Sequence, residues 1–158
     1  MYSAFLKICK LISNEFLVIP LLYGSLGLER LTGEPLNADD IDILIPSAYV
    51  RGNKWIGFKS YLETNGYMLI DEHEHTFKKD GVCYSFACIE ELESFADILQ
   101  RNIPIVNDHE TCFYLLNLEQ YLAVYTRSSA DGYRMNKKEK RDHEKIALIQ
   151  QKLNETSR

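Results

Sequence analysis

The sequence predicts an α+β fold, in which helices flank a mixed sheet and a helical segment follows at the C-terminal end. Short apolar runs of strand length alternate with amphipathic stretches along the first 117 residues. From Leu118 the apolar residues recur at helical spacing. Because 158 residues suit one domain, we expect a core over residues 1–117 and a C-terminal helical segment over 118–158 within the same compact unit.

The first part of the core combines helices with two apolar strands. Residues 2–14 place apolar side chains at helical spacing, and the run 16–23 predicts a buried strand. Pro20 favours a bent strand or one at the sheet edge, because proline has no amide hydrogen to donate. The next predicted elements are a short helix over 26–32 ending at Gly33, a strand over 40–45, and a helix over 47–65 that begins at Ser47 and ends at Asn65-Gly66.

The second part of the core is richer in strands. Strand patterns cover 67–70, 74–78 and 82–87, and Asp80-Gly81 between the last two is typical of a tight hairpin. A short helix over 90–100 and extended segments at 103–106 and 112–115 complete the core. Two helices follow: one with Leu118, Leu122 and Tyr125 on a shared face, and one over 137–153 with Ile146, Ile149 and Leu153 on its apolar face.

Composition is that of a globular protein, with 46% hydrophobic and 26% charged residues. No apolar run approaches the roughly 20 residues that a membrane-spanning helix needs, so we expect no membrane partner. The four cysteines form no closely spaced pair, which favours a reducing, cytoplasmic location over a disulfide framework.

Charge is divided unevenly along the chain. Residues 1–126 carry eighteen acidic and nine basic side chains, whereas residues 127–158 carry five acidic and nine basic ones. An acidic body does not attract long nucleic acid. Acidic groups beside a basic segment suit a metal-bound polyphosphate, although a solvated charged helix explains the basic segment equally simply.

The most informative segment is 21–46, in which two aspartates open the second strand. Alternate strand residues point to one face, so Asp40 and Asp42 should project together, with Ile41 on the opposite face. Two adjacent carboxylates repel each other, and a divalent cation between them removes that cost. Oxygen ligands favour Mg²⁺ or Mn²⁺.

Gly24-Ser25 stands between the first apolar strand and a short helix. Glycine lets the backbone turn sharply and approach a ligand closely. Amide groups at the start of the helix, together with the helix dipole, favour an anion, and the Ser25 hydroxyl adds a donor. A phosphate cradle at Gly24 and Ser25 and a metal clamp at Asp40 and Asp42 together meet the needs of nucleotidyl transfer.

These residues resemble the defining motif of the DNA polymerase β-type nucleotidyltransferase superfamily, which joins an apolar strand, Gly-Ser and Asp-hydrophobic-Asp-hydrophobic. Gly24-Ser25 and Asp40-Ile41-Asp42-Ile43 match it, and the overall plan is similar to small bacterial members, of the lincosamide or minimal type. The resemblance implies Mg²⁺ or Mn²⁺ at the aspartates and a nucleoside triphosphate as substrate. Residues 140–146 are similar to a pattern on a late helix of such proteins, which implies that Lys140 contacts the nucleotide.

The chain departs from the family pattern at one position. Active members place a third carboxylate on a later strand, as a metal ligand or general base, but residues 82–87 contain neither Asp nor Glu. Glu72, Glu74 and Glu90 stand nearby in the sequence, and we assign Glu74 the catalytic role as a prediction.

The leading hypothesis is therefore transfer of a nucleoside monophosphate from a nucleoside triphosphate to a hydroxyl of a small molecule or protein. The alternative is a catalytically inactive protein of the same fold that binds a nucleotide or a protein partner. A metal site at His73 and His75 is a third reading, with no obvious third ligand. Whether the chain forms a homodimer stays open.

Overall fold

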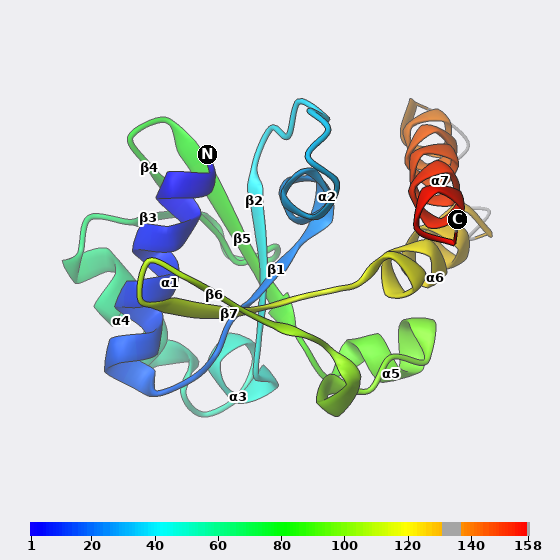
Figure 1. Ribbon diagram of the computed structural model, residues 1–158. Helices are drawn as coiled ribbons and strands as arrows, with labels where there is room; N and C mark the ends of the chain where they lie inside the picture. The colour runs from blue at the N-terminus through cyan, green and yellow to red at the C-terminus, as the bar shows by residue number, and fades with distance from the viewer. Residues whose placement is uncertain (131–136, 158) are drawn as a thin grey trace.

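The computed structural model describes the backbone of residues 1–130 and 137–157, and the side chains of residues 1–130 and 141–157. Its described strands form a seven-stranded sheet in the order β3-β4-β5-β2-β1-β7-β6 (Figure 1). The strands are β1 (Leu21–Tyr23), β2 (Ile41–Ile45), β3 (Met68–Asp71), β4 (Thr76–Lys79), β5 (Val82–Cys88), β6 (Ile105–Asp108) and β7 (Thr111–Leu115). The helices are α1 (Tyr2–Phe16), α2 (Gly24–Thr32), α3 (Ser47–Val50), α4 (Trp55–Thr64), α5 (Glu91–Ala96), α6 (Leu118–Ala130) and α7 (Lys137–Thr156), with a 3₁₀ turn η1 (Gln100–Asn102). The α+β prediction is confirmed.

The centre of the sheet is mixed in direction. β1 is antiparallel to β2 and parallel to β7, while β2 is parallel to β5. Outside this centre, β3-β4-β5 and β6-β7 are antiparallel. Tyr23, the last residue of β1, stands opposite Asp42 near the start of β2. The segment that follows β1 therefore meets the segment that opens β2.

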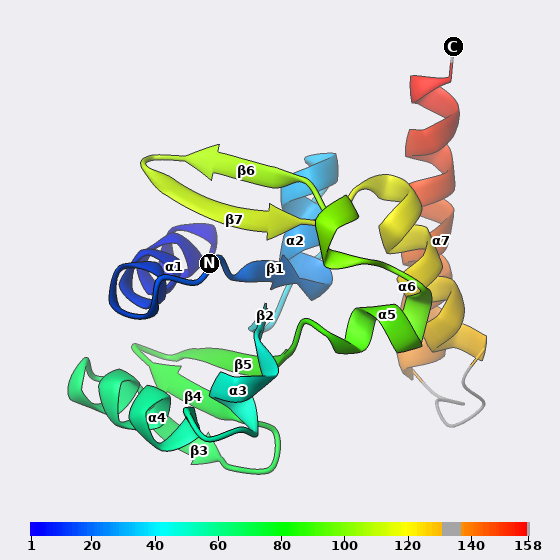
Figure 2. The ribbon, with the colours of Figure 1, turned by 90° about the horizontal axis from the view of Figure 1, so that it is seen from below.

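Helices α1 and α4 pack on one face of the sheet (Figures 1 and 2). The ring of Phe5 on α1 lies 5.0 Å from that of Phe113 on β7, and the ring of Phe58 on α4 lies 5.1 Å from that of Phe86 on β5. Phe16 joins the two helices, with its ring 5.5 Å from Phe58. The Phe5–Phe113 and Phe58–Phe86 contacts are edge to face, an arrangement that adds to the stability that burial of the rings provides.

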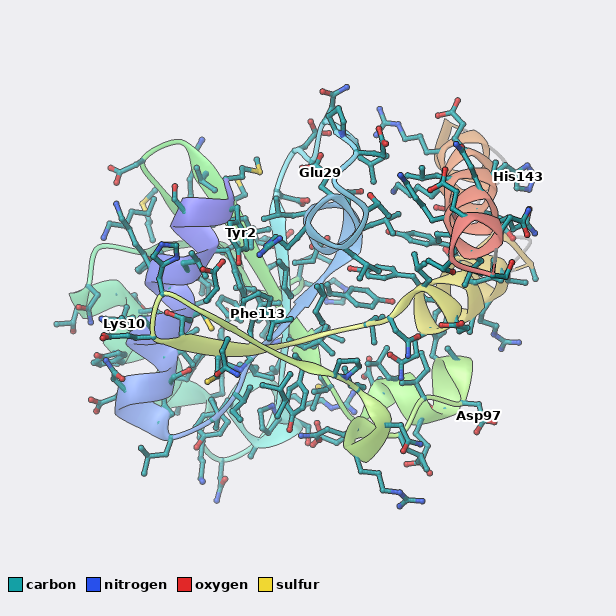
Figure 3. All side chains as sticks on the ribbon, viewed as in Figure 1. Tyr2, Lys10, Glu29, Asp97, Phe113 and His143 are labelled. Atoms are coloured by element: carbon teal, nitrogen blue, oxygen red, sulfur yellow. The ribbon has the colours of Figure 1, made fainter. Side chains whose placement is uncertain are left out.

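Helices α6 and α7 lie on the far side of α2 from α1 and pack along each other (Figure 2). Tyr121 on α6 and Ile149 on α7 are fully buried, so both helices contribute to the common core. Side chains fill the space between α2 and these helices, whereas His143 stands on the outer side of α7 (Figure 3). Among the described residues, none of the helices is both long and apolar enough to cross a membrane.

The first strand is shorter and more central than predicted. α1 continues to Phe16, and Leu17 adopts a left-handed conformation (φ 56°) that ends it. β1 lies between β2 and β7, so the prediction of an edge position for Pro20 is wrong. Pro20 precedes the strand, where its missing amide hydrogen removes no bond from the ladder, and its carbonyl accepts the Tyr114 amide at 2.9 Å.

The helix predicted over 47–65 is divided into α3 and α4. Gly52 lies in the break, where an added Cβ would stand 2.6 Å from the Cα of Ala48. Ser47 is the first residue of α3, and both its amide (3.0 Å) and its hydroxyl (2.8 Å) donate to the carboxylate of Glu90. The helix predicted over 90–100 likewise ends early, at Ala96.

The other predicted boundaries agree closely with the structure. Gly33 ends α2 in a left-handed conformation (φ 77°), and Asp80-Gly81 forms the β4–β5 turn with positive φ at both residues. The face of α6 was predicted less well, because Tyr121, Val124 and Tyr125 form its buried side.

Candidate active site at the end of the first strand

Gly24 brings the chain from β1 into α2 at a point that only glycine can occupy without strain. Its φ is +67°, in the left-handed region. A Cβ added there would lie 2.5 Å from Oδ2 of Asp42. Since Tyr23 and Asp42 are paired residues of β1 and β2, the sheet register itself presses the Asp42 carboxylate against the bend. The structure thus places Asp42 beside Gly24.

The two aspartates differ in their surroundings. Asp40 is an exposed residue in the bend just before β2, whereas Asp42 lies within β2 and is half-buried. Ile41 between them is fully buried on the other side of the strand. This alternation is the one expected from the sequence, and it leaves one carboxylate close to the bend and one open to solvent.

The start of α2 can receive an anion. Tyr23 stands at its N-cap position in an extended conformation, and its side chain makes no capping hydrogen bond to the helix. The first amides of a helix have no partner inside the helix, and they carry the positive end of the helix dipole. Ser25 and Leu26 therefore offer amide donors next to the Asp42 carboxylate.

The sheet position beside Asp42 holds a serine instead of a third carboxylate. Ser85 on β5 is the register partner of Asp42 in the parallel pairing of β2 with β5. Thr76 on β4 is in turn opposite Ser85, and their hydroxyls lie 2.8 Å apart. The strand on which the family pattern expects the third carboxylate, β5, is thus next to β2 in the sheet. At the position beside Asp42, however, β5 carries the neutral hydroxyl of Ser85.

The fold does not bring Glu74 to the aspartates. Glu74 lies in the turn between β3 and β4, with its side chain 69% exposed and 4.0 Å from Nε2 of His73. β4 is separated from β2 by β5, a distance of two strand spacings or about 10 Å. Glu74 also precedes Thr76, so the antiparallel register carries it past Ser85 towards the far end of β5. Among the residues that the structure describes, no three His, Cys, Asp or Glu side chains form a group suited to a metal ion.

The remaining acidic and histidine candidates have other surroundings. Glu90 accepts hydrogen bonds from Ser47, and these bonds and nearby Arg51 lower its pKa despite the opposing effect of burial. The ring of His75 packs 4.8 Å from that of Trp55, edge to face, while His73 is 94% exposed. The two histidines therefore face different environments.

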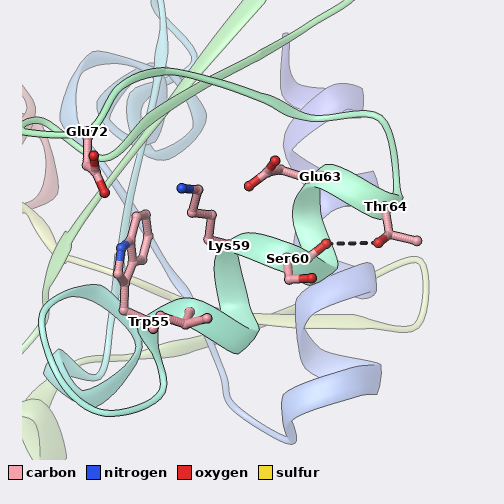
Figure 4. A pocket seen from close by; sticks show the side chains of 7 residues that line it. Trp55, Lys59, Ser60, Glu63, Thr64 and Glu72 are labelled. Atoms are coloured by element: carbon pink, nitrogen blue, oxygen red, sulfur yellow. Dashed lines mark hydrogen bonds between the residues drawn. The ribbon is translucent and has the colours of Figure 1, made fainter.

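Glu72 contributes to a separate open cleft of about 860 Å³ between α4 and the β3–β4 turn (Figure 4). Lys59 and Glu63 of α4 extend towards the same space as Glu72, and the ring of Trp55 forms part of the wall (Figure 4). Neither Asp40 nor Asp42 lines it. This cleft is not part of the candidate active site.

Two tyrosines of α6 lie against the Gly24-Ser25 bend. The hydroxyl of Tyr121 donates to the Gly24 carbonyl at 3.1 Å. Burial raises the pKa of Tyr121 well above its usual value, and the charge of Asp42 adds to the effect, so this phenol stays protonated as a donor. Burial likewise raises the pKa of Tyr125, which a side-chain hydrogen bond with Ser25 partly offsets.

The sequence did not single out Tyr121. The signal available was the pair of tyrosines four residues apart on one helix, Tyr121 and Tyr125, whose rings stack 5.9 Å apart. A large aromatic side chain with a polar end, when buried, usually finds a hydrogen-bond partner. The pattern alone could not show that this partner is the bend.

Helix α7 approaches Tyr125. Lys145 places its ammonium group 5.0 Å from the ring centroid of Tyr125. Asp142 is a buried carboxylate, 4% exposed, and accepts a hydrogen bond from the Ser128 hydroxyl at 3.0 Å. Lys140, predicted to contact the nucleotide, lies in α7, but its side chain is outside the described residues.

Comparison with known proteins places the chain in a family. No protein-family model matches it. The uncharacterized protein YnaI of Bacillus subtilis (strain 168) is 41% identical over 149 residues, which cover 94% of this chain and 95% of that protein. The chain belongs to the family of YnaI.

Solved structures with the same fold are nucleotidyltransferases or resemble them. An antigenic nucleotidyltransferase-like protein from Paracoccidioides brasiliensis has a TM-score of 0.67 at 12% identity, with 93% of this chain and 74% of that chain covered. The antibiotic-resistance factor ANT(2'')-Ia has a TM-score of 0.51 at 14% identity, with 97% and 86% covered. At these identities the likeness is one of fold, so the chain has a nucleotidyltransferase-like fold.

Proposed function

We propose that this protein is a small nucleotidyltransferase that transfers a nucleoside monophosphate from a nucleoside triphosphate to a hydroxyl group. The observation that carries the proposal is the contact between Asp42 and Gly24. It joins a carboxylate suited to a divalent cation with the start of α2, whose first amides are suited to phosphate. A metal-bound triphosphate needs both features side by side.

The donor set fits a cation that arrives with the nucleotide. Mg²⁺ is commonly held by one or two carboxylates together with substrate phosphates and water, and Asp40 and Asp42 supply such a pair. When bound, Mg²⁺ or Mn²⁺ would polarise the phosphates and offset their charge. The proposed metal site has two carboxylates and not three, because Ser85 occupies the position on β5 beside Asp42.

The residues of this chain would bind and orient the substrate. The amides of Ser25 and Leu26 and the Ser25 hydroxyl would donate to phosphate oxygens, while Asp40 and Asp42 would hold the metal. In the transfer, the acceptor oxygen forms a bond to the α-phosphorus, and the bond from that phosphorus to pyrophosphate breaks. The acceptor proton passes to a carboxylate of the pair or to water. Lys140 is proposed as a further phosphate contact.

The acceptor would be a small molecule or a protein side chain. The four cysteines are free, as expected for the cytoplasmic location that we propose. Residues 1–117 and 118–158 would act as one unit, since α6 supports the bend from which the site is built.

A second candidate is a protein of this fold that binds a nucleotide without catalysis. The hydroxyl pair of Ser85 and Thr76 favours it, because a neutral side chain beside Asp42 supplies neither a base nor a second metal ligand. Incubation of the protein with labelled nucleoside triphosphates and its own cell extract separates the two candidates. A labelled acceptor product supports the enzyme, and nucleotide binding without any product supports the binding protein.

The metal role of Asp42 has a direct test. A nucleoside triphosphate with Mg²⁺, at about a hundred times its dissociation constant, should raise the Tm by about 5 °C or more, because binding to the native state adds about 2.7 kcal/mol. Asp42→Asn should abolish the part of this rise that depends on Mg²⁺. Glu74→Gln is the matched control and should leave the rise unchanged. An equal rise in Asp42→Asn and wild type would contradict the metal role.

A further inference from the structure

Tyr121 is the most deeply enclosed polar side chain near the candidate site. It is fully buried, and its hydroxyl donates to the Gly24 carbonyl at 3.1 Å. A buried hydroxyl without a partner is costly, so this bond ties α6 firmly to the first turn of α2. The two residues are 97 positions apart in the sequence. The contact therefore belongs to the tertiary structure and not to local folding of the bend.

Gly27 makes room for this contact. A Cβ added at Gly27 would lie 2.1 Å from the Tyr121 hydroxyl and 2.8 Å from the Leu22 carbonyl oxygen. The hydroxyl thus occupies the space that a side chain on the first turn of α2 would fill. The absence of a side chain at Gly27 therefore lets the phenol reach the backbone.

The bond acts on the peptide group that carries the Ser25 amide. In a planar trans peptide, the carbonyl of one residue and the amide hydrogen of the next point in opposite directions. A Gly24 carbonyl held towards α6 therefore keeps the Ser25 amide directed away from α6. The ends of helices fray, and the Tyr23 side chain makes no capping bond to α2, so the bond from Tyr121 limits motion of the first turn.

Tyr125 lies beside the side chain of the same residue. It stands one turn further along α6, with its ring stacked 5.9 Å from that of Tyr121, and Ser25 is near enough to lower the pKa that burial of Tyr125 raises. The ammonium group of Lys145, on α7, lies 5.0 Å from the centroid of the Tyr125 ring. Two neighbouring side chains of one helix thus lie against the bend, and Tyr121 is hydrogen-bonded to its backbone.

We propose that Tyr121 and Tyr125 are positioning residues of the nucleotide site, which hold the Ser25 amide and hydroxyl in the orientation that receives phosphate. The inference rests on the proposed function, because it gives the bend the role of phosphate cradle. It adds that the C-terminal helical segment determines how well the cradle binds. Neither tyrosine contacts the reacting atoms in this account.

The experiment compares Tyr121→Phe and Tyr125→Phe with Tyr114→Phe. The control also removes one phenol hydroxyl, which at Tyr114 accepts a bond from Gln100, on a different part of the sheet. Two quantities are measured at a temperature at which all variants are folded. The first is the dissociation constant for ATP, GTP, CTP and UTP with Mg²⁺. The second is the hydrogen-exchange rate of the amides in residues 23–28 without nucleotide.

The expected result is a dissociation constant raised at least fivefold in Tyr121→Phe and Tyr125→Phe and unchanged in Tyr114→Phe. Exchange in residues 23–28 should be faster in Tyr121→Phe than in the control. A merely structural role would lower the Tm and leave the affinity of the folded protein as it is. Unchanged affinity and unchanged exchange in both variants would overturn the positioning role while the proposed function stands.

The proposed function can fail separately. If the wild-type protein binds none of the four nucleotides with Mg²⁺, the nucleotide site is wrong. The exchange rates then decide by themselves whether the two tyrosines hold the bend. Faster exchange confined to residues 23–28 would support that part of the inference, and equal rates would refute it.

Discussion

The backbone conformation of Gly24 determines where the carboxylate of Asp42 can lie. The left-handed φ of Gly24 turns the chain at the end of β1, and the absence of a side chain leaves space for the Asp42 carboxylate. Any larger residue would meet the Oδ2 atom of Asp42 at 2.5 Å. The carboxylate is the end of a rotatable side chain, so it would move before the backbone did.

Gly24→Ala should therefore separate function from stability. We expect a loss of about 1–2 kcal/mol, the usual cost of a left-handed alanine, together with loss of the Mg²⁺-dependent rise in Tm because Asp42 is displaced. Gly33→Ala is the matched control, since Gly33 has φ 77° and no atom within 4 Å of an added Cβ. It should cost a similar amount in chemical denaturation and leave the Mg²⁺ effect intact. Loss of the Mg²⁺ effect in both variants would show that the contact is irrelevant.

Elements with strong local signals could be predicted from the sequence. The apolar spacing of α1, the Gly33 end of α2 and the Asp80-Gly81 hairpin each depend on interactions within a few residues. The start of β1 was predicted too early, because the apolar residues between Leu17 and Pro20 have the composition of a strand. The left-handed conformation of Leu17, which the sequence pattern does not reveal, ends α1 and separates it from β1. The division of the helix over 47–65 falls at Gly52, whose backbone packs so closely on Ala48 that an added Cβ would lie 2.6 Å from its Cα, and apolar spacing does not reveal such a close approach.

The candidate site was predictable only in part for the same reason. The motif predicted Gly24, Ser25 and the aspartates to lie together because Gly24-Ser25 directly follows β1 and the aspartates stand at the start of β2, its neighbour in the sheet. The neighbour of Asp42 on β5 required the register, and its identity as Ser85 could only be assigned once that register was known. Tyr121 belongs to a helix far along the chain, and its role follows from packing alone.

A polar cluster around Asp108 ties three elements together. Its carboxylate accepts a hydrogen bond from the Tyr2 hydroxyl of α1 at 2.6 Å and lies 3.5 Å from the guanidinium of Arg30 on α2. His109 lies against the other carboxylate oxygen. The hydrogen bond from Tyr2, together with His109 and Arg30, lowers the pKa of Asp108. The β6–β7 hairpin is thereby joined to the helices on either side of β1.

Asp108→Asn should lower stability at neutral pH and have less effect in acid. A carboxyl group whose pKa is lower in the folded state stabilises the protein above its unfolded pKa of about 3.9 and loses that contribution as the pH falls through the folded value. Urea unfolding at pH 7 and below pH 4 should therefore show a difference between wild type and variant that shrinks in acid. Asp97→Asn, at an exposed helix end, serves as the control. A difference that stays constant with pH would refute the electrostatic role.

At the scale of the whole molecule, the C-terminal helices complete the core and the candidate site together. Among the described residues, their buried apolar side chains are Tyr121, Val124, Tyr125 and Ile149. Burial of each such side chain contributes about 1.5–3 kcal/mol, so the group is comparable in size to the total stability of about 5–15 kcal/mol of a typical domain. Tyr121 of α6 bonds to the Gly24-Ser25 bend, which links folding of the segment to formation of the candidate site.

A fragment of residues 1–117 should consequently fail to fold on its own. Without α6, the bend loses its Tyr121 anchor, and apolar side chains that face α6 and α7 become exposed to water. We expect no cooperative thermal transition and strong binding of a hydrophobic dye, whereas addition of a separate 118–158 peptide should restore part of the transition. A control fragment of residues 1–155 keeps every one of the buried α6 and α7 side chains described and should unfold cooperatively. Cooperative unfolding of 1–117 alone, with nucleotide binding intact, would show that the C-terminal helices are an accessory to a core that is complete without them.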